Sequence, residues 1–365
     1  MTNEKTAGEL KQIYKSLSWQ LLEVTENAAI AAARAAGQGN KNLADAAAVD
    51  AMRSSLNKIP GISVNVKIGE GERDDAPMLF IGERIGDGDV QIDIAVDPLE
   101  NTNATANLNS GAVCVLAAAP SGGLIQASDT YMDKLCVGKD AADYVDIRLA
   151  PEENVRRLAK ALKRRDNREL TITVLDRPRN EELIKRLRST GARVRLIMDG
   201  DLMPCVFSCF KGVGVHAVMG IGAAPEGVIS AAAIRLLGGK MQAIWKPKNA
   251  EDEERLKKMG VRLNEVYTQD DLAPAEDLIF CATAVTPILT TSKAVLEGVS
   301  FFPGGAKTNS LVITRGFMNF VPTNHVLHAE IFEKEKNEFR LYCSGWGILP
   351  LHCTFEVTHE KSNHT

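Results

Sequence analysis

Short β-branched runs alternate with helical segments between about residues 170 and 285, and this alternation constrains the fold more than any other feature. The runs are TITVL (171–175), VRLIM (194–198), VHAVM (215–219) and LIFCATAV (278–285), and helical patterns begin near Glu181, Leu202 and Glu226. Parallel strands need long crossover connections, which are usually helices. The second half of the chain is therefore predicted to be α/β, with ligands beyond the carboxyl ends of its strands.

The first half of the chain has a different pattern. Apolar residues recur at helical spacing in residues 17–36 and 43–58, and Asn42 is placed to cap the second helix. The sequence then predicts short strands, at residues 64–68, 78–82, 90–96 and 112–119. This half is therefore predicted to be α+β. We divide the 365 residues into an α+β metal-binding domain (1–165), an α/β substrate-binding domain (166–328) and a C-terminal tail of unknown order (329–365).

The composition excludes several classes of protein. The formal net charge is −4, so the sequence lacks the excess positive charge that nucleic-acid binding needs. It also has no run of 18 apolar residues that could span a membrane. The N-terminal residues lack the apolar core of a signal peptide, so we expect a cytoplasmic protein. All six histidines lie at position 216 or later, which argues against a Ser-His-Asp hydrolase and a His-ligated zinc enzyme. The seven cysteines form no CxxC pair and are expected to be reduced thiols.

Two predicted strands end in clusters of acidic residues. The stretch DIAVDPLENT (93–102) contains Asp97, Glu100 and Thr102. The stretch KIGEGERDD (67–75) contains four acidic residues: Glu70, Glu72, Asp74 and Asp75. If the two strands are neighbours, their carboxylates repel one another, and a divalent cation removes that penalty. Clustered Asp and Glu without His or Cys favours Mg²⁺ or Mn²⁺ over zinc.

Two more carboxylates are candidate metal ligands. Asp45 is expected in the first turn of the second helix, and Glu226 stands at the start of a later helix. The alternative is that the positive end of each helix dipole favours a carboxylate there without any metal.

The loops after the later strands suit a phosphate and a sugar. Arg177 and Arg179 flank Pro178, which stiffens the loop, and paired guanidinium groups bind phosphate well. The alternative is a pair of arginines that face solvent. Asp199 and Asp201 are candidates for accepting hydrogen bonds from sugar hydroxyls.

Metal carboxylates and phosphate-holding arginines together predict a phosphoester hydrolase that anchors a second phosphate. Divalent ions promote attack of water on phosphorus, so no protein nucleophile is needed. Thr102 would position or deprotonate that water, and Glu72 and Asp74 are assigned to the same catalytic group. No chemistry is assigned to residues 246–260, whose alternating charges predict a solvated helix.

The chain also contains a set of motifs that resembles the class II fructose-1,6-bisphosphatases and their dual fructose/sedoheptulose bisphosphatase relatives. These motifs are GEGERDDAPMLFIGE, DIAVDPLENT, SDTYMDKL, RPRN, MDGD and GIGAAPEGVISAAAIR. The resemblance covers roughly residues 18–328 and implies the layered sugar-phosphatase fold. It implies metal ligands at Asp45, Glu70, Asp97, Glu100 and Glu226. It implies substrate contacts at Glu100, Asn101, Thr102, Tyr131, Arg177, Pro178, Arg179, Asp199, Gly200, Asp201 and Ala223.

The activity that the resemblance implies is Mn²⁺- or Mg²⁺-dependent removal of the 1-phosphate from fructose 1,6-bisphosphate, and from sedoheptulose 1,7-bisphosphate, by a homo-oligomer. Asn101 stands where the family carries glycine, and Asn tolerates the left-handed backbone that such a turn needs. Two alternatives stay open. One is a phosphatase of the inositol monophosphatase type, which needs no second phosphate anchor, and the other is a catalytically silent sugar-phosphate-binding subunit.

Overall fold

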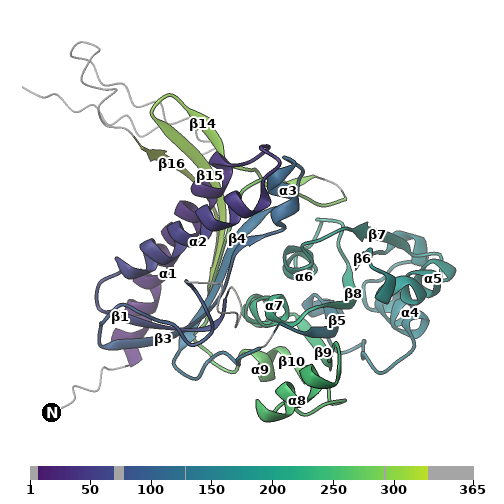
Figure 1. Cartoon of the computed structure of the whole chain (residues 1–365). Helices are drawn as coiled ribbons and strands as arrows, with labels where there is room; N and C mark the ends of the chain where they lie inside the picture. Colours follow the sequence, from purple (N-terminus) through teal and green to yellow (C-terminus); the bar gives the residue numbers. More distant parts are fainter. Residues whose placement is uncertain (1–6, 70–77, 128, 292, 328–365) are drawn as a thin grey trace, which may run out of the picture.

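The computed structural model describes residues 7–69, 78–127, 129–291 and 293–327 (Figure 1). Its helices are α1 (Ala7–Arg34), α2 (Lys41–Asn57), α3 (Thr102–Ala106), α4 (Pro151–Ala161), α5 (Glu181–Ser189), α6 (Leu202–Phe207), α7 (Ala224–Leu236), α8 (Ala250–Lys258) and α9 (Gln269–Leu272), with 3₁₀ turns at Lys139–Ala141, Asn167–Glu169 and Pro178–Asn180. Its strands are β1 (Ile62–Ile68), β2 (Arg84–Ile85), β3 (Val90–Glu100), β4 (Val113–Pro120), β5 (Tyr131–Val137), β6 (Thr171–Leu175), β7 (Arg193–Ile197), β8 (Ala217–Ala223), β9 (Lys240–Lys246), β10 (Tyr267–Thr268), β11 (Ile279–Ala284), β12 (Ile288–Leu289), β13 (Ala294–Leu296), β14 (Ser300–Phe302), β15 (Gly305–Thr314) and β16 (Phe317–Val326).

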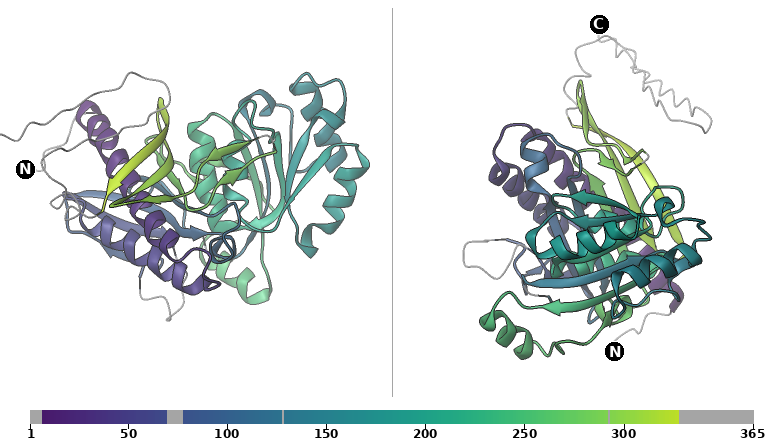
Figure 2. Two further views of the ribbon diagram at one scale, coloured as in Figure 1. Left: turned by 90° about the horizontal axis from the view of Figure 1, so that it is seen from above. Right: turned by 90° about the vertical axis from the view of Figure 1, so that its right-hand side faces the viewer.

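Most strands belong to two large sheets. The first sheet has the order β14-β15-β11-β4-β3-β1-β2, with β16 paired to β15, and the second has the order β10-β9-β5-β8-β6-β7. Helices separate and cover these sheets in layers, as Figures 1 and 2 show. Helices α1 and α2 pack on the outer face of the first sheet, α7 lies between the two sheets, and α4 and α5 cover the outer face of the second. The molecule is therefore a mixed α/β protein built in five layers, as predicted.

Helix α7 can occupy the middle layer because its residues are small and apolar. Its sequence is APEGVISAAAIRL, and Gly227, Ser230 and Ala231–Ala233 are all buried. A helix that is apolar on every side must be buried on every side. Small side chains let both sheets approach α7 closely, so residues at its amino end lie where the two sheets face each other.

The strands that end in acidic residues are neighbours, which was the condition for their carboxylates to meet, and the predicted parallel pairing of the later strands is confirmed. Strands β1 and β3 pair in parallel, with Ile68 beside Ala95, so the segments that follow them start at the same edge of the first sheet. Strands β6, β7 and β8 are also parallel neighbours, and Leu175 pairs with Ile197 at their carboxyl ends. The loops that follow these strands therefore share one rim of the second sheet.

Other local predictions were wrong. Asn40 rather than Asn42 caps α2, because the Asn40 side chain accepts a hydrogen bond from the backbone N–H of Leu43 at 3.1 Å. The strand predicted at residues 78–82 does not form. There the Leu79 backbone has a φ of 55° and its N–H donates to the Glu83 carboxylate, so the segment turns.

Sheet membership does not follow the boundary predicted at residue 166. Strand β5 lies in the second sheet although it precedes that boundary, and β11, β14, β15 and β16 return to the first sheet. The return occurs because the whole of β11 pairs with β4, from Ala284 opposite Val113 to Ile279 opposite Ala118. The division into domains at 165 and 328 stays a prediction.

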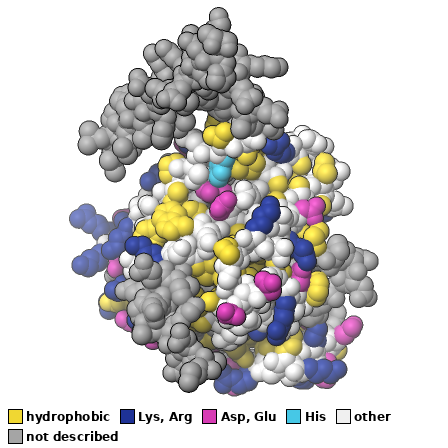
Figure 3. Space-filling view, turned by 90° about the vertical axis from the view of Figure 1, so that its left-hand side faces the viewer, with side chains coloured by type: hydrophobic (Ala, Val, Ile, Leu, Met, Phe, Trp, Pro, Cys, Tyr) yellow, Lys and Arg dark blue, Asp and Glu magenta, His cyan; other side chains and the backbone are white. Residues whose placement is uncertain are grey.

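The surface is mixed in character. On the face drawn in Figure 3, hydrophobic side chains lie among positive and negative ones. Within the described ranges, no helix has both the length and the hydropathy that a bilayer-spanning segment requires.

A buried carboxylate ties the first helix to the last two strands. Glu26 of α1 is 4% exposed, and its Oε1 accepts hydrogen bonds from the hydroxyls of Thr308 (3.0 Å), Ser310 (3.2 Å) and Thr323 (2.6 Å). These donors lie on β15 and β16. Glu26 therefore fixes the outer helix to the strands that close the sheet.

We expect Glu26→Ala to lower the free energy of unfolding by about 2–4 kcal/mol, because three hydroxyls lose their acceptor in a buried site. Urea unfolding followed by circular dichroism measures this loss. Glu23→Ala on the exposed face of the same helix is the matched control, with an expected change within about 0.5 kcal/mol. Equal midpoints for the two variants would contradict a structural role for the Glu26 network.

Candidate active site

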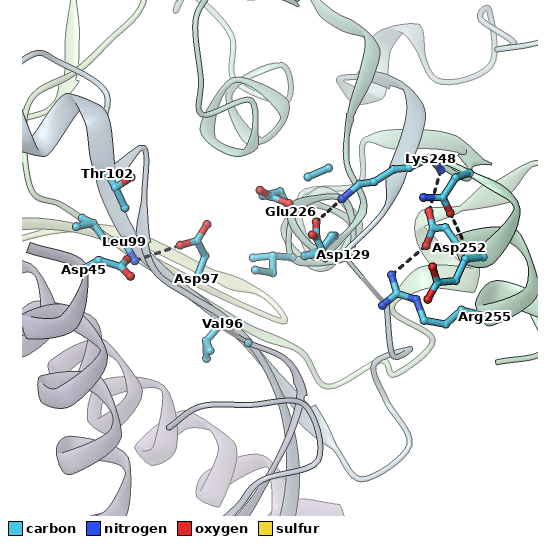
Figure 4. Close-up of a pocket in the computed structure, with 16 residues that line it drawn as sticks. Asp45, Val96, Asp97, Leu99, Thr102, Asp129, Glu226, Lys248, Asp252 and Arg255 are labelled. Carbon is cyan, nitrogen blue, oxygen red and sulfur yellow. Dashed lines mark hydrogen bonds and ion pairs between the residues drawn. The ribbon is translucent and has the colours of Figure 1, made fainter. Parts of the chain in front are cut away.

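A cavity of about 660 Å³ lies between the two sheets, where β3 and β8 end. Its lining includes the carboxylates of Asp45, Asp97 and Glu226 together with Thr102 and Ala223. Figure 4 shows Asp45, Asp97 and Thr102 on one side and Glu226 across from them. Predicted metal and substrate positions from α2, β3, α3, β8 and α7 therefore meet in one space.

The turn after β3 positions two of these residues. The register against β4 shifts between Asp97 and Glu100, and Asp97 Oδ1 accepts a hydrogen bond from the Leu99 N–H at 3.1 Å. Asn101 follows in the left-handed region, with a φ of 66°. As expected, asparagine replaces glycine without losing the turn, and its side chain caps α3 by accepting from the Ala104 N–H at 3.2 Å. Thr102 is thereby fixed as the first residue of α3.

Glu100 is buried among other acids. One of its oxygens, Oε1, accepts a hydrogen bond from the Leu202 N–H at 3.2 Å, and Oε2 is buried without a hydrogen-bond partner among the described residues. Burial raises the pKa of Glu100 well above its usual value, and the neighbouring charges of Asp97, Glu226 and Asp201 raise it further. This carboxylate therefore needs positive charge that the described side chains around it do not fully supply.

Lys134 pairs with one of the neighbouring acids, Asp201. This lysine of β5 is 1% exposed, its Nζ lies 2.6 Å from Asp201 Oδ2, and it donates to the Ala223 carbonyl at 3.2 Å. Burial lowers the pKa of Lys134, but Asp201, Cys205 and Glu226 together outweigh that effect and the net shift is upward, so the side chain stays charged. Burial also raises the pKa of Glu226 to about 7, against the lowering effect of Lys134. Asp201 Oδ2 is held in this ion pair, and the contact of Asp201 with a sugar hydroxyl stays a prediction.

The donors in this region suit a hard divalent cation. Glu226 Oε2, like Glu100 Oε2, is buried without a hydrogen-bond partner in the described chain, and burial raises the pKa of Asp45. Asp45 lies beyond the first turn of α2, so the dipole of that helix does not account for it. Oxygen donors without His or Cys match Mg²⁺ or Mn²⁺. Across the described residues, however, no three or more His, Cys, Asp or Glu side chains form a group that could hold a metal ion.

Part of the predicted set lies outside the described residues. Glu70, which the resemblance gives as a metal ligand, belongs to the segment 70–77, as do Glu72 and Asp74, the two predicted catalytic acids. Gly69, directly before them, lines the cavity. The chain therefore enters that segment at the cavity wall.

The two arginines of the RPRN motif have different surroundings. The guanidinium carbon of Arg179 lies 4.3 Å from the centroid of the Tyr131 ring, and Lys248 Nζ lies 5.0 Å from the same centroid. Arg179 is held by a hydrogen bond of 3.0 Å from its Nε to the Ile221 carbonyl. Tyr131, Arg179 and Lys248 form a positively charged group beside the cavity, which Lys248 lines.

Arg177 instead points to a second cavity of about 430 Å³, which Asn101, Asp199 and Gly200 also line. Its Nη2 lies 3.1 Å from Asp199 Oδ1. Pro178 begins the 3₁₀ turn that separates the two arginines. Arg177 and Arg179 therefore do not act as a pair. Arg179 lies beside the main cavity and Arg177 lines the second cavity, and the turn that contains Asn101 and Thr102 lies between the two cavities.

The sequence analysis missed several residues of the cavity wall. Lys248, Asn249, Asp252 and Arg255 line the main cavity, although residues 246–260 were predicted to be a solvated helix. Asp252 is buried, and it accepts hydrogen bonds from Thr130 and from the Lys248 N–H. The alternating charges of this segment did not indicate that it lines a cavity or that Asp252 is buried. Lys134 was also missed, although it belongs to the quoted motif SDTYMDKL.

Several known proteins are similar to this chain over most of its length. The family described as "Bacterial fructose-1,6-bisphosphatase, glpX-encoded" matches residues 15–325. The chain is 44% identical over 339 residues to a protein of Synechocystis sp., covering 85% of this chain and 96% of the relative. It is 45% identical over 340 residues to a protein of Synechococcus elongatus, covering 86% and 96%. Both relatives are named D-fructose 1,6-bisphosphatase class 2/sedoheptulose 1,7-bisphosphatase.

These matches confirm the resemblance that the motifs suggested. They extend over both sheets and over the described residues that line the two cavities. The chain belongs to the glpX-encoded family of bacterial fructose-1,6-bisphosphatases.

Proposed function

We propose that this chain hydrolyses the 1-phosphate of fructose 1,6-bisphosphate, and also acts on sedoheptulose 1,7-bisphosphate, by direct attack of water on phosphorus. The observation that carries the proposal is a pair of buried carboxylate oxygens, Glu100 Oε2 and Glu226 Oε2, which have no hydrogen-bond partner among the described residues. Glu226 lines the main cavity together with Lys248 and Arg255, which form ion pairs with Asp129 and Asp252. Carboxylates on one side and cations on the other suit a substrate with two phosphates.

Asp45, Asp97, Glu100 and Glu226 would hold Mn²⁺ or Mg²⁺, with Glu70 as a further ligand. A divalent ion there would offset the repulsion among the carboxylates and stabilise the negative charge that develops on the phosphate oxygens. Lys134 keeps Asp201 and the end of β8 in place, so that Glu226 is held toward the cavity.

Thr102 positions the attacking water. Its side chain lines the cavity at the amino end of α3, where the backbone N–H groups are directed outward. A hydroxyl both donates and accepts hydrogen bonds, so it can orient a water molecule and relay its proton. Glu72 and Asp74 are proposed to take part in the same proton transfer.

The second phosphate binds to Arg179, Tyr131 and Lys248. The guanidinium and ammonium groups supply charge, and both contact the Tyr131 ring, while Lys248 Nζ also lies 2.9 Å from Asp129 Oδ1. Asp199 and Gly200, beside Arg177, would contact the sugar between the two phosphates. Ala223, at the end of β8, forms the floor against the reacting phosphate.

We further propose a cytoplasmic homo-oligomer. Support for assembly comes from exposed apolar side chains on β14 and β16, where Phe301 is 50%, Met318 45% and Phe320 38% exposed. Light scattering of the purified protein should give at least twice the mass of one chain. A monomeric mass at micromolar concentration would remove this part of the proposal.

Phosphate release from a panel of sugar mono- and bisphosphates tests the proposed reaction. We expect release from fructose 1,6-bisphosphate with Mn²⁺ or Mg²⁺, and a return to background after EDTA. Equal rates on monophosphates would instead indicate an enzyme of the inositol monophosphatase type. Calorimetry that shows tight bisphosphate binding without any hydrolysis would indicate a silent binding subunit.

Glu226→Gln should lower kcat by about 100-fold or more, because it removes a charged ligand and leaves the volume unchanged. Glu182→Gln on the exposed face of α5 is the matched control and should keep the parent rate. A Glu226→Gln enzyme with the parent kcat and the parent dependence on Mn²⁺ would show that this carboxylate holds no metal.

Arg179→Ala should raise KM for fructose 1,6-bisphosphate by about tenfold or more, since it removes a charged contact to the second phosphate. Binding of inorganic phosphate, measured as product inhibition, should change much less. Arg188→Ala, an exposed arginine on α5, controls for the loss of one positive charge. An unchanged KM would place the second phosphate elsewhere.

A further inference from the structure

A third cavity, of about 800 Å³, lies at the far end of the second sheet from the active site. It lies where β6, β7 and β8 begin, because Arg193 is the first residue of β7 and His216 directly precedes β8. The active-site rim lies where the same strands end. We call this space the remote cavity. Its volume falls in the range of about 300–1,000 Å³ that small-molecule sites occupy.

Positive side chains from several elements line the remote cavity. They are Lys139, Lys163, Arg164, Arg193 and Lys211, joined by His216. The lining contains two carboxylates, Asp140 and Glu169. Five cations against two anions leave an excess of positive charge in a concave surface, where low-dielectric walls strengthen it.

Both carboxylates already have partners. Lys211 Nζ lies 2.8 Å from Asp140 Oδ2, and Arg164 Nη1 lies 4.0 Å from Glu169 Oε2. Throughout the described parts of the chain, no carboxylate lies within 4.0 Å of the charged nitrogens of Lys139, Lys163 or Arg193. Three cations from three different segments are therefore left without an anionic partner around one cavity.

Several of these cations shift the pKa of a titratable group in the cavity wall. Lys211 lowers the pKa of Asp140, and Lys139 and Lys163 add to the effect. On the other wall, burial lowers the pKa of His216, and Arg164 contributes to the same shift. His216 is held there as an acceptor, because its Nδ1 accepts a hydrogen bond from the Thr171 N–H at 2.9 Å. The five cations are exposed side chains, and they lie around one cavity.

The backbone at Lys163 supplies a second observation. Lys163 follows the end of α4 with a φ of 54°, a left-handed conformation that glycine usually provides at this position. A residue with a side chain is less stable than glycine in that conformation. Strain of this kind persists where a side chain is used, and Lys163 faces the remote cavity.

We propose that the remote cavity binds a small phosphorylated anion, with a phosphate or diphosphate group held by Lys139, Lys163 and Arg193. Phe210 also lines the cavity and offers an apolar surface to the rest of such a ligand. The site is separate from the active site, because β8, which joins them, has seven residues and spans roughly 20 Å.

Hydrogen–deuterium exchange of the full chain with inorganic diphosphate locates the site directly. The measurement is made in EDTA, so that no divalent ion brings the ligand to the active-site carboxylates. We expect slower exchange of backbone amides in residues 138–142 and 211–216, and the same protection in Arg179→Ala. Protection confined to residues 223–226 and 248–255 would overturn the proposal, because diphosphate would then occupy only the active site.

Calorimetry with inorganic diphosphate gives the second test. The double variant Lys163→Gln/Arg193→Gln should bind at least about tenfold more weakly than the parent, because two charged contacts are lost. Lys185→Gln/Arg188→Gln on exposed α5 removes the same charge away from the cavity and should bind like the parent. Both pairs are exposed, so folding is preserved. Equal affinities for the two double variants would overturn the proposal.

Discussion

Repulsion among carboxylates packed between two sheets is the constraint on which the active site depends. Glu100 and Glu226 are buried and interact with Asp97 and Asp201, and a dry environment makes each unpaired charge costly. Lys134 compensates Asp201 from within the second sheet. The remaining negative charge must be met by a bound cation or by protons, so the site is built to need a partner that the described side chains do not supply.

The layers explain how that charge can be concentrated. Asp45 and Asp97 come from the helix and strand of the first sheet, while Glu226 comes from α7 in the middle layer. The cations Arg179 and Lys248 stand on the side of the second sheet. Neither sheet alone carries a complete site. Under the proposed function, one phosphate of the substrate lies at the carboxylates and the other lies at Arg179 and Lys248.

Much of this arrangement could be predicted from the sequence, because it depends on local signals. Acidic residues directly after a β-branched run predicted the end of β3. The alternation of strands and helices predicted that Arg177, Asp199 and Ala223 lie together at the carboxyl ends of the second sheet's strands. The left-handed turn at Asn101 followed from the conformational tolerance of asparagine. Each of these features is decided within a few residues of the chain.

The contacts that could not be predicted are those between distant segments. Lys134 resembles any lysine in a strand until β5 pairs with β8 and brings it to Asp201. Lys248 and Asp252 sit in a charged stretch, and only the tertiary structure turns them toward the cavity. The return of β11, β15 and β16 to the first sheet was missed for the same reason, since strand patterns do not reveal which sheet a strand joins.

That return has a consequence for the order in which the protein can fold during synthesis. Strand β4 leaves the ribosome early, but its hydrogen-bonding edge is covered only when β11 arrives, with Val113 pairing with Ala284. The six-stranded sheet is encoded between them and can form first. The first sheet therefore keeps an open, apolar edge until β11 has been made, and pairing between strands so far apart in the sequence is slow.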